Sequence, residues 1–150
     1  MEMAWVLTVL GTIAADREDW DEAKEIGDRA LRFLAGGATD EYWTAAVVFA
    51  FGARLAVHAD RLDLARDRLA RAARLRPLLT YALPVVSTMA LIEMARVYVA
   101  LADPAGAVAV LRQAHGILLQ RPQLGRLGPQ VEELHARVRY SFRCARVIPT

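Results

Sequence analysis

The stretch LGTIAADREDWDEAKEIGDRA, residues 10–30, recurs in outline as GARLAVHADRLDLARDRLARA at 52–72 and as MARVYVALADPAGAVAVLRQA at 94–114. The copies therefore follow one another at a period of 42 residues. Each contains two alanines seven positions apart, which places both on one stripe of a helix: Ala23 with Ala30, Ala65 with Ala72, and Ala107 with Ala114. An apolar residue followed by a small one precedes each pair of alanines, so the repeat spans two helices. A fixed period of this size indicates a helical-repeat architecture.

These spacings resemble the tetratricopeptide repeat, in which an apolar–small pair marks the first helix and two alanines mark the second. The resemblance implies an all-α fold, a right-handed superhelix of three antiparallel helix pairs within one domain. On that frame the repeats cover about residues 4–45, 46–87 and 88–127, and a capping helix follows at about 129–145. The period exceeds the roughly 34 residues of that family, so we expect each helix to be about one turn longer.

The periodicity and the turn residues predict seven helices and no strand. Asp40 is a candidate N-cap, and the apolar linker at 76–83 is expected to lie on the structure. The last helix has apolar positions at Val131, Leu134, Val138 and Phe142, which is typical of an amphipathic cap. The expected helices cover about 2–15, 20–35, 40–58, 62–75, 85–101, 104–120 and 129–145.

The composition favours an ordinary helical domain in a reducing compartment. Of the 150 residues, 55% are hydrophobic and 24% are charged, which excludes a disordered chain. The single cysteine, Cys144, excludes an internal disulfide and a cysteine-based zinc site. Glu2 stands where a signal peptide needs positive charge, and Arg54 and Pro84 interrupt the longest apolar runs. We therefore expect a cytoplasmic protein without a membrane span.

Residues for catalysis are scarce. The chain has no glycine-rich phosphate loop, no nucleophile elbow and no paired metal ligands at helical spacing. Its three histidines, His58, His115 and His135, belong to different expected helices. We therefore expect no enzyme activity, no catalytic residue, no cofactor and no metal site.

The first helix of each pair is expected to line a concave groove. Two turns into that helix the repeat frame places Thr12, Arg54 and Arg96, and two guanidinium groups in adjacent rows suit a carboxylate or a phosphate. The alternative is that these arginines pair with acids such as Glu93 or cover apolar surface with their stems. The candidate residues for binding a peptide or small ligand are Arg54, Arg96, Trp5, Thr12, His58 and Met89.

Charge is divided unevenly along the chain. Residues 1–42 carry a net charge of −6, whereas 43–83 and 84–150 carry +4 each. Such polarity could drive head-to-tail stacking of chains or docking to further repeats, or it could belong to solvated ion pairs such as those of Asp63 and Asp67 with Arg66 and Arg71. The arginine-rich segment 61–76 is a weaker candidate for nucleic-acid binding, because three aspartates, Asp60, Asp63 and Asp67, lie near its arginines.

A narrower resemblance covers about the last 65 residues. The segments at 94–107 (MARVYVALADPAGA), 122–125 (PQLG) and 131–134 (VEEL) resemble the MalT-like repeat region of large LuxR-type transcriptional regulators. The resemblance implies signal sensing and self-association, with ATPase and DNA-binding modules elsewhere in the parent protein. We expect an interaction or sensing domain whose partner is a protein, a peptide or another domain of such a regulator, with a homodimer as one arrangement. A stand-alone adaptor that binds peptides or acidic ligands is the alternative.

Overall fold

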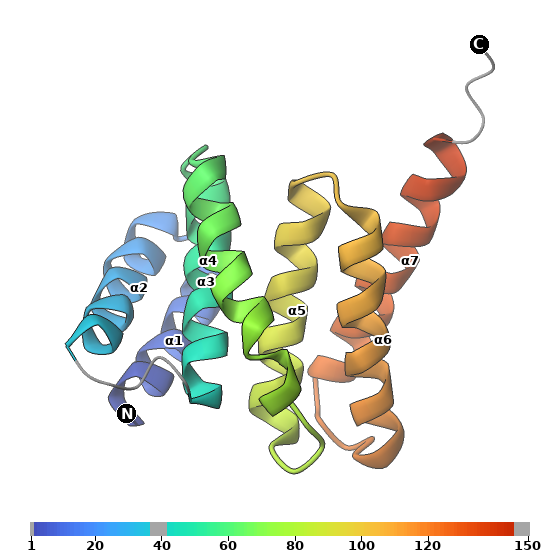
Figure 1. The fold of residues 1–150 in the computed structure, drawn as a ribbon, viewed down its shortest axis with the longest axis horizontal. Helices are drawn as coiled ribbons and strands as arrows, with labels where there is room; N and C mark the ends of the chain where they lie inside the picture. Colours follow the sequence, from blue (N-terminus) through green and yellow to red (C-terminus); the bar gives the residue numbers. More distant parts are fainter. Residues whose placement is uncertain (1, 37–41, 146–150) are drawn as a thin grey trace.

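The computed structural model describes residues 2–36 and 42–145, and within these the side chains of 3–36, 42–141 and 143. The described residues form seven α-helices and one short 3-10 helix, with no strand (Figure 1). The elements are α1 (Glu2–Asp16), α2 (Trp20–Ala35), α3 (Trp43–His58), α4 (Leu62–Arg74), η1 (Arg76–Leu78), α5 (Pro84–Ala100), α6 (Pro104–Gln120) and α7 (Leu127–Ala145). The expectation of an all-helical fold with seven helices is confirmed.

Two expected helix starts differ from the structure by more than one residue. The helix expected from residue 40 is described from Trp43, and the proposed cap Asp40 lies outside the described residues. The last helix begins at Leu127 rather than 129, because a proline is tolerated in the first turn and Pro129 therefore does not have to open the helix. The linker at 76–83 lies on the structure as expected, with η1 at its start and Leu79 buried.

The same turn joins the two helices of each sequence repeat. Glu18, Asp60 and Ala102 stand at equivalent positions and have φ values of 62°, 57° and 55°. Beyond each of them a backbone N–H reaches back five residues to a helix carbonyl: Asp19 to Ala14, Arg61 to Ala56, and Asp103 to Tyr98. This is the Schellman arrangement, which satisfies carbonyls at a helix end. The periodicity of the sequence is therefore matched by a periodic backbone.

Packing explains why the spacing of small residues recurs in the three copies of the repeat. The six alanines of the motif are all fully buried, where α1 packs on α2, α3 on α4, and α5 on α6. Gly106 of α6 also lies where a larger residue would clash with α5, since a Cβ there would lie 2.4 Å from Cδ1 of Tyr98. Only small side chains allow these helices to approach so closely.

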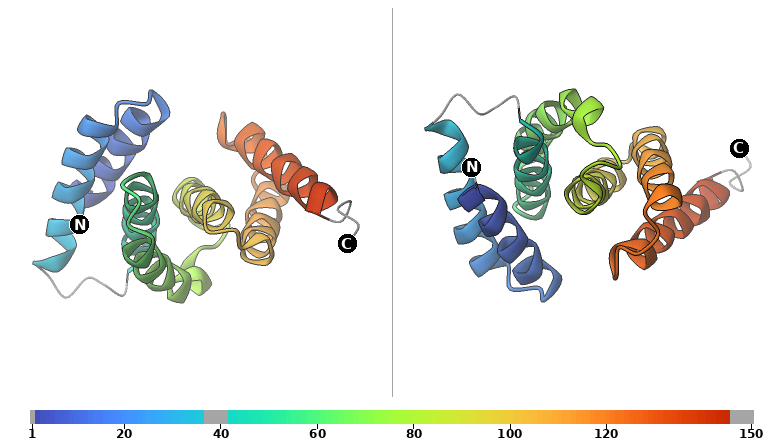
Figure 2. Two further views of the ribbon diagram at one scale, coloured as in Figure 1. Left: turned by 90° about the horizontal axis from the view of Figure 1, so that it is seen from above. Right: turned by 90° about the horizontal axis from the view of Figure 1, so that it is seen from below.

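Helices α3 and α5 occupy the middle of the molecule. Each contacts helices on both sides: α3 packs against α1, α2, α4 and α5, and α5 packs against α3, α4, α6 and α7. Their sequences are apolar around the whole helix, as expected for buried helices. The C-terminal end of α1 and the N-terminal end of α7 converge on one side of this central layer (Figure 2).

The last helix is amphipathic, as its sequence predicts. Val131, Leu134 and Val138 are buried against the core, while the opposite face is exposed and carries Glu132, Glu133, Arg137 and Arg139. The side chain of Phe142 lies outside the described residues. Separately, no helix in the described part of the chain is long and apolar enough to cross a membrane.

Candidate ligand-binding pocket

Arg54 and Arg96 lie side by side on α3 and α5, and both bind Glu93. Arg54 Nη1 donates to Oε1 and Oε2 of Glu93 at 3.1 and 3.3 Å, and Arg96 Nη1 donates to Oε1 at 2.7 Å. Asp16, at the end of α1, accepts from Arg54 Nη2 at 3.1 Å and lies 3.5 Å from Arg96 Nη1. Two cations thus face two carboxylates, so the four-residue network is neutral in total.

Glu93 is the buried centre of this network. The residue is only 1% exposed, and burial raises the pKa of its carboxyl group, while the positive charges of Arg54 and Arg96 oppose that rise. The Arg54 side chain, 14% exposed, also lies over the ring of Trp20, with Cζ 5.5 Å from the ring centroid. The network therefore ties α1, α3 and α5 together and has little freedom to exchange partners.

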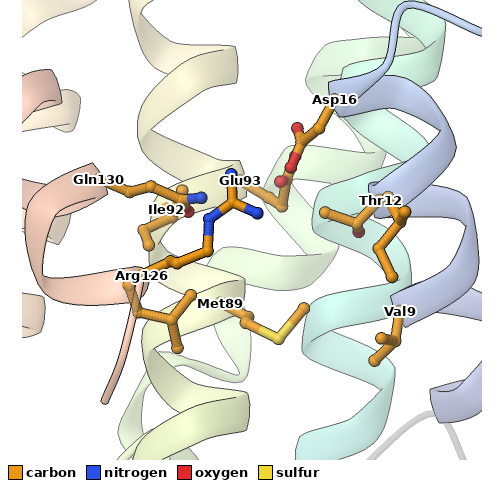
Figure 3. Close-up of a pocket in the computed structure, with 10 residues that line it drawn as sticks. Val9, Thr12, Asp16, Met89, Ile92, Glu93, Arg126 and Gln130 are labelled. Carbon is orange, nitrogen blue, oxygen red and sulfur yellow. The ribbon is translucent and has the colours of Figure 1, made fainter. Parts of the chain in front are cut away.

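A pocket of about 160 Å³ opens beside this network (Figure 3). Its walls come from α1, from α5 and from the beginning of α7. One part is mostly apolar, and the other carries four side chains that are charged or bear an amide. The lining residues are Val9, Thr12, Ile13, Met89, Ile92 and Leu127, together with Asp16, Glu93, Arg126 and Gln130.

Arg126 differs from the other two arginines of the site. It precedes α7, is exposed, and directs its guanidinium group into the pocket toward Asp16 and Glu93 (Figure 3). No ion pair or hydrogen bond of its side chain occurs with any residue that the structure describes. Gln130 projects from the next turn on the same side. The polar end of the pocket thus has a guanidinium group and an amide that are available to a ligand.

The structure brings some of the residues selected from the sequence together and separates others. Thr12 and Met89 line the pocket, although the Thr12 hydroxyl donates to the carbonyl of Thr8. Arg54 and Arg96 are adjacent, and both pair with Glu93, which is the alternative that the sequence analysis gives for them. Trp5 packs against the main core. His58 stacks on Trp20, with centroids 3.8 Å apart.

Sequence reasoning did not select Arg126, Gln130 or Asp16 for this site. The first two belong to the start of the capping helix, which falls outside the three-copy pattern, so no repeat position identifies them. Asp16 stands at the end of α1, where the sequence indicates only a turn. The spacing could have identified Asp16, because it follows Thr12 by four residues and so lies on the same face of α1.

The arginine-rich segment at 61–76 is largely engaged within the molecule. Arg66 pairs with Asp63 and Arg71 with Asp67, as anticipated from the sequence. Arg68 donates to the carbonyl of Gly52, and Arg76 donates to Gln113. Binding of a phosphate backbone needs a cluster of available cations, which this distribution does not favour.

No group of three or more histidine, cysteine or acidic residues in the described regions is placed to hold a metal ion. Comparison with protein-family models, with curated proteins and with solved structures returned no match for this chain.

Proposed function

We propose that this chain is a non-catalytic interaction domain whose pocket between α1, α5 and α7 binds an apolar residue next to a carboxylate on a peptide or protein partner. The observation that carries the proposal is the guanidinium group of Arg126, which lies at the end of an apolar pocket and has no ion pair or hydrogen bond to the residues that the structure describes. A guanidinium group binds a carboxylate through two parallel hydrogen bonds, which makes it well suited to such a ligand.

The volume of the pocket limits the size of what enters it. Pockets for drug-sized molecules usually measure roughly 300–1,000 Å³, whereas this one measures about 160 Å³. A single aliphatic side chain fits that volume better than a complete cofactor does. The ligand is then one anchoring residue of a longer partner, with the rest of the partner lying on the neighbouring surface.

The charges favour an anion over a cation. Arg54 and Arg96 neutralise Asp16 and Glu93 within the network, so these carboxylates offer little to a second cation. Arg126 adds one positive charge at the open side. The pocket therefore attracts a carboxylate such as a peptide C-terminus or an acidic side chain, and Gln130 can donate to its second oxygen.

We further propose that the helix pairs form a right-handed superhelix and that the domain belongs to a LuxR-type regulator with a MalT-like repeat region. The 42-residue period, the repeated turn geometry and the segments at 94–107, 122–125 and 131–134 support this assignment. In such a protein the pocket would serve signal sensing. A parent reading frame that lacks both an ATPase module and a helix-turn-helix would contradict the assignment and leave a stand-alone adaptor.

The pocket is tested with two small probes that differ only at the carboxylate. We expect N-acetyl-leucine to shift the NMR signals of the Met89 methyl group and the Gln130 side-chain amide in the 150-residue protein, and N-acetyl-leucinamide to shift them much less. Arg126→Gln should weaken binding of the carboxylate by about tenfold, since a charge-assisted hydrogen bond contributes about 1.5 kcal/mol or more.

The matched control is Arg137→Gln, because Arg137 is exposed like Arg126 but lies within α7 and does not line the pocket. This variant should bind N-acetyl-leucine as the unmodified protein does. Equal binding of the acid and the amide, or equal weakening by both substitutions, would contradict the proposed anion site.

A further inference from the structure

The exposed side of α1 carries a continuous apolar stripe. Four large side chains on it are between 43% and 53% exposed, at positions that recur every three or four residues and so follow one face of the helix. They are Met3 (53%), Val6 (48%), Leu10 (49%) and Ile13 (43%), called here the α1 face. A helix that is apolar on all sides belongs in an interior, and α1 has a sequence of that kind.

The repeat shows what covers these positions elsewhere in the molecule. One period further along the chain they correspond to Ala45, Val48, Gly52 and Leu55 of α3, and two periods along to Ser87, Ala90, Met94 and Val97 of α5. All eight of these residues are buried. The equivalent positions on the first helix of each pair are therefore buried in α3 and in α5 but exposed in α1.

The residues that cover this register come from the preceding helix pair. At Gly52 the closest approaches of an added Cβ include Leu31 of α2 at 3.3 Å, and Leu55 lies against Gly27 of α2. Helix α3 packs on both α1 and α2, and α5 packs on both α3 and α4. In each case the first helix of a pair rests on the pair before it, and α1 has no such neighbour among the described residues.

We propose that the α1 face is the docking surface for a further helix pair of the same repeat, joined in front of α1 in a longer polypeptide. The two junctions within the molecule, α3 on α1 and α2 and α5 on α3 and α4, show how such a pair would pack. In repeat proteins each unit is stabilised by its interface with the next, and an uncovered end requires a cap with a polar outer face. Helix α7 has such a face at the other end, and α1 does not.

The charge distribution argues against a second copy of this chain as the occupant. A two-fold dimer through α1 would bring together two N-terminal segments that each carry a net charge of −6. Head-to-tail stacking would set the apolar α1 face against the exposed face of α7, with Glu132, Glu133, Arg137 and Arg139. Burying these charged side chains against Val6 and Leu10 would be costly.

The test adds one helix pair from this chain to the complete protein. Residues 43–84, which contain α3, α4, η1 and the first residue of α5, are placed directly before Met1. The 42-residue period then continues, and Met1 takes the place that Val85 has now after Pro84. We expect the extended protein to unfold in one thermal transition, with a midpoint about 5 °C or more above that of the 150-residue protein. Binding of an apolar fluorescent dye should fall at the same time.

The double variant Val6→Gln/Leu10→Gln identifies the surface responsible. Both side chains are exposed and neither lines the pocket, so the 150-residue variant should keep its midpoint within about 2 °C and its binding of N-acetyl-leucine. In the extended protein the same substitutions should abolish the gain. Leu119→Gln, at an exposed leucine of α6 outside the stripe, should leave the gain intact.

Three results would overturn the proposal. The added pair could unfold in a separate transition, or the gain could survive Val6→Gln/Leu10→Gln. Light scattering could instead show that the 150-residue protein is a dimer that the same double variant separates, which would assign the α1 face to a second copy.

Discussion

Replacement of Arg54 by methionine tests the network that joins three helices. Methionine keeps much of the apolar length of the side chain but removes a guanidinium group that donates to both Glu93 and Asp16. Loss of one partner of a buried ion pair usually costs about 3–5 kcal/mol. Arg96 remains 2.7 Å from Glu93, so we expect a value near the lower limit, about 3 kcal/mol at pH 7.

The loss should depend on pH with a defined sign. Burial raises the pKa of Glu93, and Arg54 is the largest influence that opposes this rise. Without Arg54 the folded-state pKa moves further above the unfolded value of 4.5. Between these two values the folded protein binds a proton that the unfolded chain has released, so the stability of the variant falls as pH rises. The deficit relative to the unmodified protein should be largest at pH 8 and smaller at pH 5.

Urea unfolding followed by circular dichroism between pH 5 and pH 8 measures this effect. In a separate thermal unfolding experiment at pH 7, the melting temperature should fall by about 6–12 °C, given about 2–4 °C per kcal/mol in a protein of this size. Arg137→Met is the control, because the Arg137–Glu133 pair is exposed and such pairs contribute at most about 1 kcal/mol. Adding Glu93→Gln to Arg54→Met should restore part of the loss at pH 7. A deficit below about 1 kcal/mol, or one equal at pH 5 and pH 8, would refute the reasoning.

The repeat itself makes two further predictions. Ala102→Gly should raise the free energy of unfolding in urea by about 0.5 kcal/mol, because relief of a left-handed alanine gains about 1–2 kcal/mol and the greater entropy of glycine in the unfolded chain cancels part of that gain. Ala109→Gly, on the exposed side of α6, should instead lower the free energy of unfolding by about 1 kcal/mol. Ala72→Leu should lose about 1–3 kcal/mol by overpacking a fully buried position, whereas Ala70→Leu at an exposed position of α4 should change the free energy of unfolding by less than about 0.5 kcal/mol. Equal effects of the two substitutions in either pair would contradict the packing and turn arguments.

The sequence predicted the features that repeat, and it missed contacts that depend on how distant helices pack together. The small residues and turns gave the start of α2 at Trp20 and of α6 at Pro104, because close helix contact and helix termination are local requirements that recur in each copy. The Arg54–Glu93 pairing was foreseen as an alternative because both residues fall on the first helices of adjacent pairs. Arg126 was not, because its position in the pocket depends on how α7 packs back toward α1. The stacking of His58 on Trp20 also depends on tertiary packing.

The pocket is lined by the first helix and by the last. A molecule bound there would contact α1 and α7 together and would bridge the two ends of the array, which otherwise interact mainly with their own neighbours. Binding would then oppose any separation of α1 from α7. The distance between α1 and α7 would then depend on whether the pocket is occupied, and a pair of fluorophores attached to these two helices would measure it.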